Sequence, residues 1–223
     1  MNVRLEIVYR TAKGLETGFS SGDMRVEEAI SLAEDLERTG RLKSVVFFDG
    51  RDRTWTLKEL RRFVREVEDE PHHVVVYFDG GFDKQSGEAG LGAAVYYEQN
   101  GRSWRVRRNE HGGTVASNNE AEYAALLLAA EELEALGAGR LPITVRGDSQ
   151  VVINQLAGEW PVMDEGLNSW ADRIEAKWQA LGVEVNYELV TRKENREADH
   201  LAGQALKGVG VRSRVEIDNS EDK

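Results

Sequence analysis

The chain has 223 residues, of which 40% are hydrophobic and 31% are charged, so it can bury the core of a folded protein. It has no cysteine and no uninterrupted apolar run of about 18 residues, which excludes a disulfide framework, a thiolate zinc site and a membrane span. The net charge of −11 argues against a general nucleic-acid binder, because affinity for phosphate normally comes from clustered Lys and Arg.

A break in the chain falls near residues 66–74, where an acidic run and Pro71 interrupt any helix. We therefore expect a first domain over residues 1–70 and a second over residues 71–208. The remaining residues, 209–223, are polar and are predicted to form a loose tail.

The first domain has the pattern of a small α+β unit. Two strand-like stretches come first, Arg4–Thr11 and Leu15–Phe19. A helix follows, with apolar residues three and four positions apart at Val26, Ala29, Ile30, Ala33 and Leu36. An apolar strand at 44–50 and a second helix, which opens at Thr56, complete the order β-β-α-β-α.

The second domain opens with five apolar residues at Val74–Phe78, which indicate a strand buried on both faces. The other predicted elements are a hairpin of Gly90–Glu98 and Arg102–Arg108, a helix at Asn119–Leu136, a strand at Pro142–Arg146, helices at Ser149–Leu156 and Glu165–Leu181, a strand at Val183–Leu189 and a helix at Asn195–Leu206. This order predicts an α/β domain, a mixed sheet flanked by helices.

Four acids fall at the ends of these elements. Asp79 directly follows the buried strand, and Asp148 ends the strand after the long helix. Glu122 lies in the first turn of the long helix, and Asp199 lies on the last helix. If they converge, each pair at 4 Å repels by about 4 kcal/mol at an effective dielectric near 20. A metal-free site should then hold at least one carboxyl with a raised pKa, and divalent cations would remove the penalty.

Each acid also has a simpler interpretation when it is taken alone. Asp79 and Asp148 could be turn or helix-capping residues. Glu122 could merely favour the helix dipole, and Asp199 could be an ordinary solvated residue. The combination of the four is more specific than any one of them.

The motifs YFDGG, NNxAEY, GDSQ and NREAD-x-LA, in this order over about residues 73–208, resemble those of type 1 ribonuclease H. The similarity is to the archaeal-like branch and to bacterial ribonuclease H-like proteins with an extra N-terminal domain. It implies a five-stranded mixed sheet and hydrolysis of the RNA strand of RNA–DNA hybrids by two Mg²⁺ (or Mn²⁺) ions. Two such ions activate a water and stabilise the leaving oxygen. The implied metal ligands are Asp79, Glu122, Asp148 and Asp199.

The resemblance also implies six substrate-binding residues, Gly80, Gly81, Asn118, Asn119, Gln150 and Asn195. Asn118 and Asn119 would place amides in the minor groove, where the 2′-hydroxyl distinguishes RNA from DNA. The two glycines would let the backbone approach the substrate, or could form a plain turn. Helix capping is the alternative for the asparagines, and a surface helix start is the alternative for Gln150.

The chain departs from the family in two places. The loop LVTRKEN lacks the His that many bacterial members carry, and Arg192 is the expected replacement in the catalytic site. An Arg cannot act as a general base near neutral pH, so Arg192 would position phosphate or be a simple surface charge. In place of a basic protrusion the chain has GEWPVMDEG, where Trp160 could stack on the DNA strand or pack in the core.

Two other sets of residues bear on function. One strand offers a modest basic patch through Arg102, Arg105, Arg107 and Arg108. Alternation puts Arg105 and Arg107 on one face with solvent, so a plain outer surface is the expectation for it. The histidines show no ligand spacing with the acids, and none is interpreted as catalytic: His72, His73, His111 and His200.

Three functions remain open at this point. The first is the hybrid nuclease, whose partner would be an RNA–DNA hybrid. The second is a weak or inactive module that binds nucleic acid or protein, and the third is a different nuclease on the same sheet, such as a resolvase or transposase. Residues 1–70 do not resemble a hybrid-binding module, and a docking or self-association surface is the hypothesis for them. A cytoplasmic location fits best, because the N-terminus lacks the features of a signal peptide.

Overall fold

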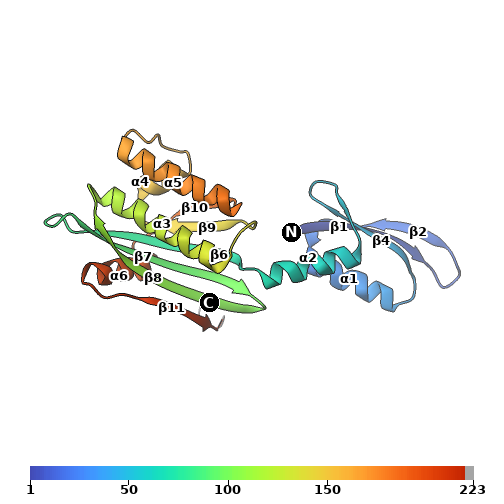
Figure 1. Cartoon of the computed structure of the whole chain (residues 1–223). Coiled ribbons are helices and arrows are strands. Elements are labelled where there is room, and N and C mark those ends of the chain that lie inside the picture. The colour runs from blue at the N-terminus through green and yellow to red at the C-terminus, as the bar shows by residue number, and fades with distance from the viewer. Residues whose placement is uncertain (219–223) are drawn as a thin grey trace. The chain divides into compact units, whose positions relative to one another are not determined.

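The computed structural model of the chain describes residues 1–218 and contains two compact units. The first unit is Met1–Asp69, and the second begins at Glu70. Each unit has its own sheet and its own helices (Figure 1). Within the described residues, no helix combines the length and the apolar character that a membrane span requires.

The first unit is an antiparallel sheet in the order β2-β1-β4-β5, with β3 paired to β1. Its strands are β1 (Asn2–Arg10), β2 (Glu16–Ser20), β3 (Met24–Arg25), β4 (Leu42–Asp49) and β5 (Thr54–Trp55). Its helices are α1 (Val26–Arg38) and α2 (Leu57–Asp69). Alternate residues of β1, Val3 and Leu5, are buried with both helices, so one face of the sheet carries the core. The short strands β3 and β5 are additions to the predicted order.

A buried carboxylate ends β4. Asp49 is 4% exposed and accepts hydrogen bonds from the backbone N–H groups of Arg51 and Arg53, at 2.9 and 3.1 Å. The Arg53 guanidinium and the Trp55 indole donate to its other oxygen. Burial acts to raise the pKa of Asp49, but these hydrogen bonds lower it to about 2. The carboxylate therefore stays ionised and fastens the turn between β4 and β5.

The second unit is built on a six-stranded sheet in the order β10-β9-β6-β7-β8-β11. Its strands are β6 (His72–Phe82), β7 (Glu88–Gln99), β8 (Arg102–Thr114), β9 (Ile143–Gly147), β10 (Val185–Leu189) and β11 (Arg212–Ile217). The pairs β10–β9 and β9–β6 are parallel, and the other pairs are antiparallel. The sheet is mixed as predicted, but it has one strand more than the five expected.

Helices cover both faces of this sheet (Figure 1). They are α3 (Asn118–Leu136), α4 (Gln150–Leu156), α5 (Glu165–Leu181) and α6 (Arg196–Leu206). The long helix α3 packs on β6 and β7, and α5 packs against α3. The core on this side includes Tyr123, Phe78 and Ile174, all fully buried. The predicted α/β fold is confirmed.

The C-terminal segment corrects the prediction of a loose tail over 209–223. β11 pairs antiparallel with β8 and so extends the sheet. The buried Asn109 side chain secures this segment, because its Nδ2 donates to the carbonyl oxygens of Leu201 and Val209, both at 2.9 Å. A polar sequence did not indicate this strand because an edge strand needs no continuous apolar face. Residues 219–223 of the predicted tail lie outside the described residues.

Candidate active site

Two of the acids lie side by side because the strands that carry them are parallel. In the parallel pair of β6 and β9, Tyr77 lies opposite Arg146. Asp79 and Asp148 each follow these residues by two positions, so the two acids come to lie beside each other. Asp79 lies inside β6, since this strand continues to Phe82 instead of ending at the predicted position. Parallel pairing therefore carries both acids to the same region of the sheet.

The third acid comes from α3, which approaches β6 unusually closely. A Cβ on Gly80 would lie 2.2 Å from the carbonyl carbon of Ala121 and 2.3 Å from the nitrogen of Glu122. Only glycine permits this approach. The Gly80 N–H donates to Glu122 Oε2 at 3.1 Å. One carboxylate oxygen from each of Asp79, Glu122 and Asp148 then lies within 4.8 Å of the others.

The fourth acid is carried by α6 on the opposite face of the sheet. A Cβ on Gly90 or Gly92 would lie 2.3 Å from a carbonyl oxygen of α6, so the helix packs directly on the backbone of β7. Asp199 is exposed on this helix. Its charge is near enough to help raise the pKa of Asp79, but it is not one of the three acids grouped within 4.8 Å.

Burial and mutual repulsion raise the pKa of two of these acids. Burial first, and then the charges of Asp148 and Asp199, raise the pKa of Asp79 to about 7. Burial and the charge of Asp79 raise the pKa of Glu122 to about 8, although the Gly80 N–H acts in the opposite direction. The metal-free cluster therefore retains protons near neutral pH, as the sequence predicts for converging carboxylates.

The donor set of the cluster suits a hard divalent cation. All of its ligand atoms are carboxylate oxygens, which Mg²⁺ and Mn²⁺ prefer, and a cation removes the repulsion between them. The Asp148 side chain is 13% exposed, so the cluster is open to solvent on that side. An ion bound there could keep several waters, as Mg²⁺ usually does.

Asn195 has a different position from the one expected of a substrate-binding or helix-capping residue. It is fully buried, and its Nδ2 donates to the Phe78 carbonyl oxygen at 2.9 Å and to Asp148 Oδ1 at 2.7 Å. It precedes α6, but its side chain makes no capping hydrogen bond to that helix. Asn195 is therefore a positioning residue that ties the start of α6 to β6 and orients the Asp148 carboxylate.

Replacing Asn195 with Ala is expected to lower the free energy of unfolding by about 2–4 kcal/mol, because a buried and a part-buried hydrogen bond are lost and the second is to a charged group. Urea denaturation would measure the change. Asn168→Ala is a matched control, since Asn168 makes an exposed hydrogen bond on α5 and should cost less than about 0.5 kcal/mol. Equal losses in the two variants would contradict the assigned role.

Gly80→Ala is expected to destabilise the second unit by about 1–3 kcal/mol, because the new methyl group would overlap the backbone of α3. Gly203→Ala provides the contrast, since nothing lies within 4 Å of a Cβ there and Gly203 is inside α6. That variant should gain about 0.5–1 kcal/mol from helix propensity. Melting temperatures from calorimetry would test the pair, and a neutral Gly80→Ala would refute the close approach.

Three of the other predicted substrate residues lie at helix starts, and two lie within a strand. Asn118 is exposed and Asn119 partly exposed at the first turn of α3, and the exposed Gln150 begins α4. Helix capping, the simpler explanation for the asparagines, falls instead to Ser117, whose side chain accepts the hydrogen bond from the first turn. Gly80 and Gly81 lie within β6, so the plain turn suggested for them is wrong.

Arg192 and Trp160 are both accessible to a ligand. The Arg192 side chain is 83% exposed, and its Nε lies 3.5 Å from Asp148 Oδ2. Trp160 lies in the segment between α4 and α5 and is 43% exposed, so it is not part of the core. Arg192 can therefore contact a substrate that approaches the carboxylate cluster, and Trp160 is free to contact a ligand on its own surface.

The arginines of β8 are paired with acids. Each of its four arginines lies within 4.0 Å of a carboxylate oxygen. The partners are Glu216 for Arg102, Glu197 for Arg105 and Arg107, and Glu110, Glu131 and Glu132 for Arg108. These arginines therefore do not form a free cationic surface, which agrees with the plain outer surface expected for this strand.

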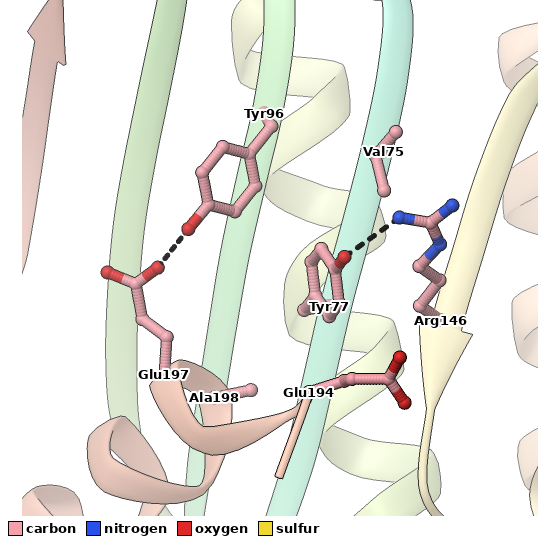
Figure 2. Close-up of a pocket in the computed structure, with 7 residues that line it drawn as sticks. All are labelled: Val75, Tyr77, Tyr96, Arg146, Glu194, Glu197 and Ala198. Atoms are coloured by element: carbon pink, nitrogen blue, oxygen red, sulfur yellow. Dashed lines mark hydrogen bonds between the residues drawn. The ribbon is translucent and has the colours of Figure 1, made fainter. Parts of the chain in front are cut away.

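A hollow of about 310 Å³ lies on the face of the sheet that α6 covers (Figure 2). It is lined by Val75, Tyr77, Tyr96, Arg146, Glu194, Glu197 and Ala198. The Tyr96 hydroxyl donates to Glu197, and Arg146 Nη1 donates to the Tyr77 hydroxyl at 2.8 Å. None of the four acids lines it. Alternation along β6 places Tyr77 on the same face of the sheet as Asp79. This alternation is the sequence signal that could have indicated a polar hollow beside the acids.

A family model described as reverse transcriptase-like matches residues 77–205, a range that contains all four acids. The chain belongs to the ribonuclease H family. This membership confirms the resemblance in the sequence and makes the chain a nuclease. The ribonuclease H fold occupies the second unit, where the matched residues lie.

Known proteins and solved structures are similar to this ribonuclease H chain. The uncharacterized protein YpeP of Bacillus subtilis is 43% identical over 204 residues, which cover 92% of this chain and 90% of YpeP. Ribonuclease HI of Halobacterium salinarum is 35% identical over 60% of this chain and 64% of its own length. The crystal structure of RNase H1 from that archaeon matches with a TM-score of 0.52 at 31% identity, over 60% of this chain and 98% of that one.

A structure of LC11-RNase H1 in complex with an RNA/DNA hybrid also matches. Its TM-score is 0.53 at 25% identity, over 60% of this chain and 97% of that chain. The match to YpeP is longer than the second unit, so it includes much of the first unit as well. The solved ribonucleases H therefore resemble one part of the chain, and YpeP resembles nearly all of it.

Proposed function

We propose that the chain hydrolyses the RNA strand of RNA–DNA hybrids with two Mg²⁺ or Mn²⁺ ions held by Asp79, Glu122, Asp148 and Asp199. The observation that carries the proposal is the convergence of three carboxylates within 4.8 Å, beside a fourth on α6. Membership of the ribonuclease H family supports the reaction, and the hybrid complex of LC11-RNase H1 supports the substrate.

The side chains around the cluster would prepare it for this reaction. When bound, the ions supply an activated water and stabilise the leaving oxygen. Asn195 and Arg192 hold the two oxygens of Asp148, and the Gly80 N–H holds one oxygen of Glu122. The ligand oxygens are thus oriented before any ion or substrate arrives, which limits the reorganisation that catalysis requires.

Four side chains that are exposed or partly exposed are proposed to bind the hybrid. Asn118 and Asn119 precede Glu122 by four and three residues, so they share its face of α3 and can reach a substrate held at the cluster. Their amides would donate to and accept from a 2′-hydroxyl. Arg192 would bind a phosphate as a fixed cation without taking up a proton. Gln150, at the start of α4, would contact the same strand.

The test is cleavage of a hybrid whose RNA strand is end-labelled, with Mg²⁺, with Mn²⁺ and with a chelator. We expect cuts only in the RNA strand, with 3′-hydroxyl and 5′-phosphate ends, and none in duplex DNA or duplex RNA of the same sequence. Retained hybrid binding without cleavage at any metal concentration would instead identify a non-catalytic binding module. Two observations favour this second candidate: the arginines of β8 are paired with acids, and the net charge of the chain is −11.

A further inference from the structure

A second group of metal-ligating side chains lies at the start of β6, apart from the carboxylate cluster. His72, His73 and Glu98 each offer one ligand atom, and these atoms lie within 4.8 Å of one another. Glu98 is on β7 and pairs in register with His72. The spacing of the histidines along the sequence gave no sign of this group, because the hairpin register brings Glu98 to them.

An irregularity in β6 places both histidines beside the same carboxylate. In a regular strand two consecutive side chains point to opposite faces of the sheet. Here the register shifts between His72 and Val75, and His73 has a φ of 52°, in the left-handed region. Such a backbone is uncommon for a residue other than glycine. Its effect is to bring His73 Nδ1 within 3.2 Å of the Glu98 oxygen that also faces His72.

The hydrogen bond of His72 directs a lone pair toward Glu98. Its Nδ1 lies 2.9 Å from the carbonyl oxygen of Glu70, and because a carbonyl only accepts, Nδ1 carries the hydrogen. In the neutral ring Nε2 then has no hydrogen, and it lies 3.7 Å from Glu98 Oε2. Two electron-rich atoms in this arrangement need a proton or a metal ion between them. A ligating histidine that donates its other N–H to a carbonyl is the usual outer-shell arrangement of metal sites.

The distances fit a small tetrahedral ion. Metal–ligand bonds of about 2.0–2.2 Å place neighbouring ligand atoms of a tetrahedral Zn²⁺ site roughly 3.3–3.6 Å apart. The two nitrogen-to-oxygen distances here are 3.7 and 3.2 Å. His72 is largely buried, with 12% of its side chain exposed, whereas His73 is 75% exposed and Glu98 44%, so an ion can enter from solvent.

We infer that His72, His73 and Glu98 form a binding site for Zn²⁺ or a similar late first-row cation, distinct from the Mg²⁺ or Mn²⁺ cluster. Imidazole nitrogens favour such ions, whereas carboxylate oxygens alone favour the harder ones. Two histidines and one glutamate leave a position for water. The bound ion would link the start of β6 to β7 and stabilise the irregular segment that supplies its ligands.

The experiment measures Zn²⁺ affinity of the full chain in excess Mg²⁺, by competition with a chromophoric chelator. We expect one tight equivalent in the wild type and in Asp79→Asn, and affinity at least about 10-fold weaker in His73→Asn and Glu98→Gln. His73→Asn suits the test because His73 is exposed and asparagine tolerates the left-handed backbone. Co²⁺ absorption bands that disappear in the same variants would provide a second readout.

The matched control is His111→Gln, which removes another exposed histidine that lies near a single glutamate, 3.7 Å from Glu88. It should bind Zn²⁺ as the wild type does. Loss of the tight equivalent in Asp79→Asn, with retention in His73→Asn, would place the ion in the carboxylate cluster and overturn the inference. Absence of any tight equivalent in the wild type would reduce the group to a pair of histidine–carboxylate contacts.

Discussion

Replacing Asp79 with Asn is expected to lower kcat/KM for hybrid hydrolysis by about 10³-fold or more. The change keeps the size of the side chain and removes its charge, so the cluster loses part of the field that binds the ions. Loss of about 4 kcal/mol of transition-state stabilisation, as metal-assisted reactions commonly derive from their ions, corresponds to this factor. Initial rates on a labelled hybrid at saturating Mg²⁺ would measure it.

Asp172→Asn is the appropriate control for Asp79→Asn. Asp172 is exposed on α5 and is not one of the four acids, so the same chemical change there should leave the rate within about twofold. Circular dichroism would verify that both variants fold. Unchanged hydrolysis by Asp79→Asn would show that the carboxylate cluster does not carry the reaction, whatever the control does.

Without divalent cations, the second unit is expected to lose stability as the pH rises from about 4 to about 8. When the pKa of an acid is higher in the folded state than in the unfolded state, the acid stabilises the fold fully at pH values below its unfolded pKa. This stabilisation is lost as the pH rises through the folded-state pKa. For Asp79 these values are 3.8 and about 7. At about 1.4 kcal/mol per pKa unit, the loss reaches about 4 kcal/mol, or roughly 8–16 °C in melting temperature.

Calorimetry with a chelator at about pH 4 and about pH 8 would measure this loss. Mg²⁺ added at the higher pH should restore most of it, because the ions replace the protons. Asp79→Asn should be more stable than the wild type at the higher pH with the chelator present. The stability of the first unit should depend on pH in the opposite direction through Asp49, whose pKa is lowered to about 2. The first unit should therefore lose stability only as the pH falls into the acidic range. A pH-independent transition of the second unit would contradict the raised pKa values.

The sequence was sufficient to predict the fold and the order of the acids along the chain. Buried strands appear as apolar runs, and hairpin and helix signals fixed where most elements begin. Asp79 and Asp148 could be expected to meet because acids that follow parallel strands reach the same region of a sheet. The raised pKa of at least one carboxyl followed from that convergence.

What the sequence could not provide depends on contacts between distant segments. Gly90 and Gly92 allow α6 to lie on β7, yet glycines at alternate positions also occur in turns and bulges. Asn195 is polar but fully buried, and only the positions of Phe78 and Asp148 explain it. Asp49 and Asp79 are both buried acids, the first at the end of β4 and the second inside β6. The pKa of Asp49 is lowered and that of Asp79 is raised, because only Asp49 is surrounded by N–H donors.

The edge strand β11 has a practical consequence for work on the isolated second unit. The family match ends at residue 205, so a fragment cut at that boundary would lack β11 and the carbonyl group of Val209 that Asn109 binds. The backbone N–H and C=O groups of β8 that β11 covers would then face water along an open margin, where another molecule could add a strand. Such a fragment should self-associate more readily than one that extends to residue 218, in which β8 and Asn109 keep their partners.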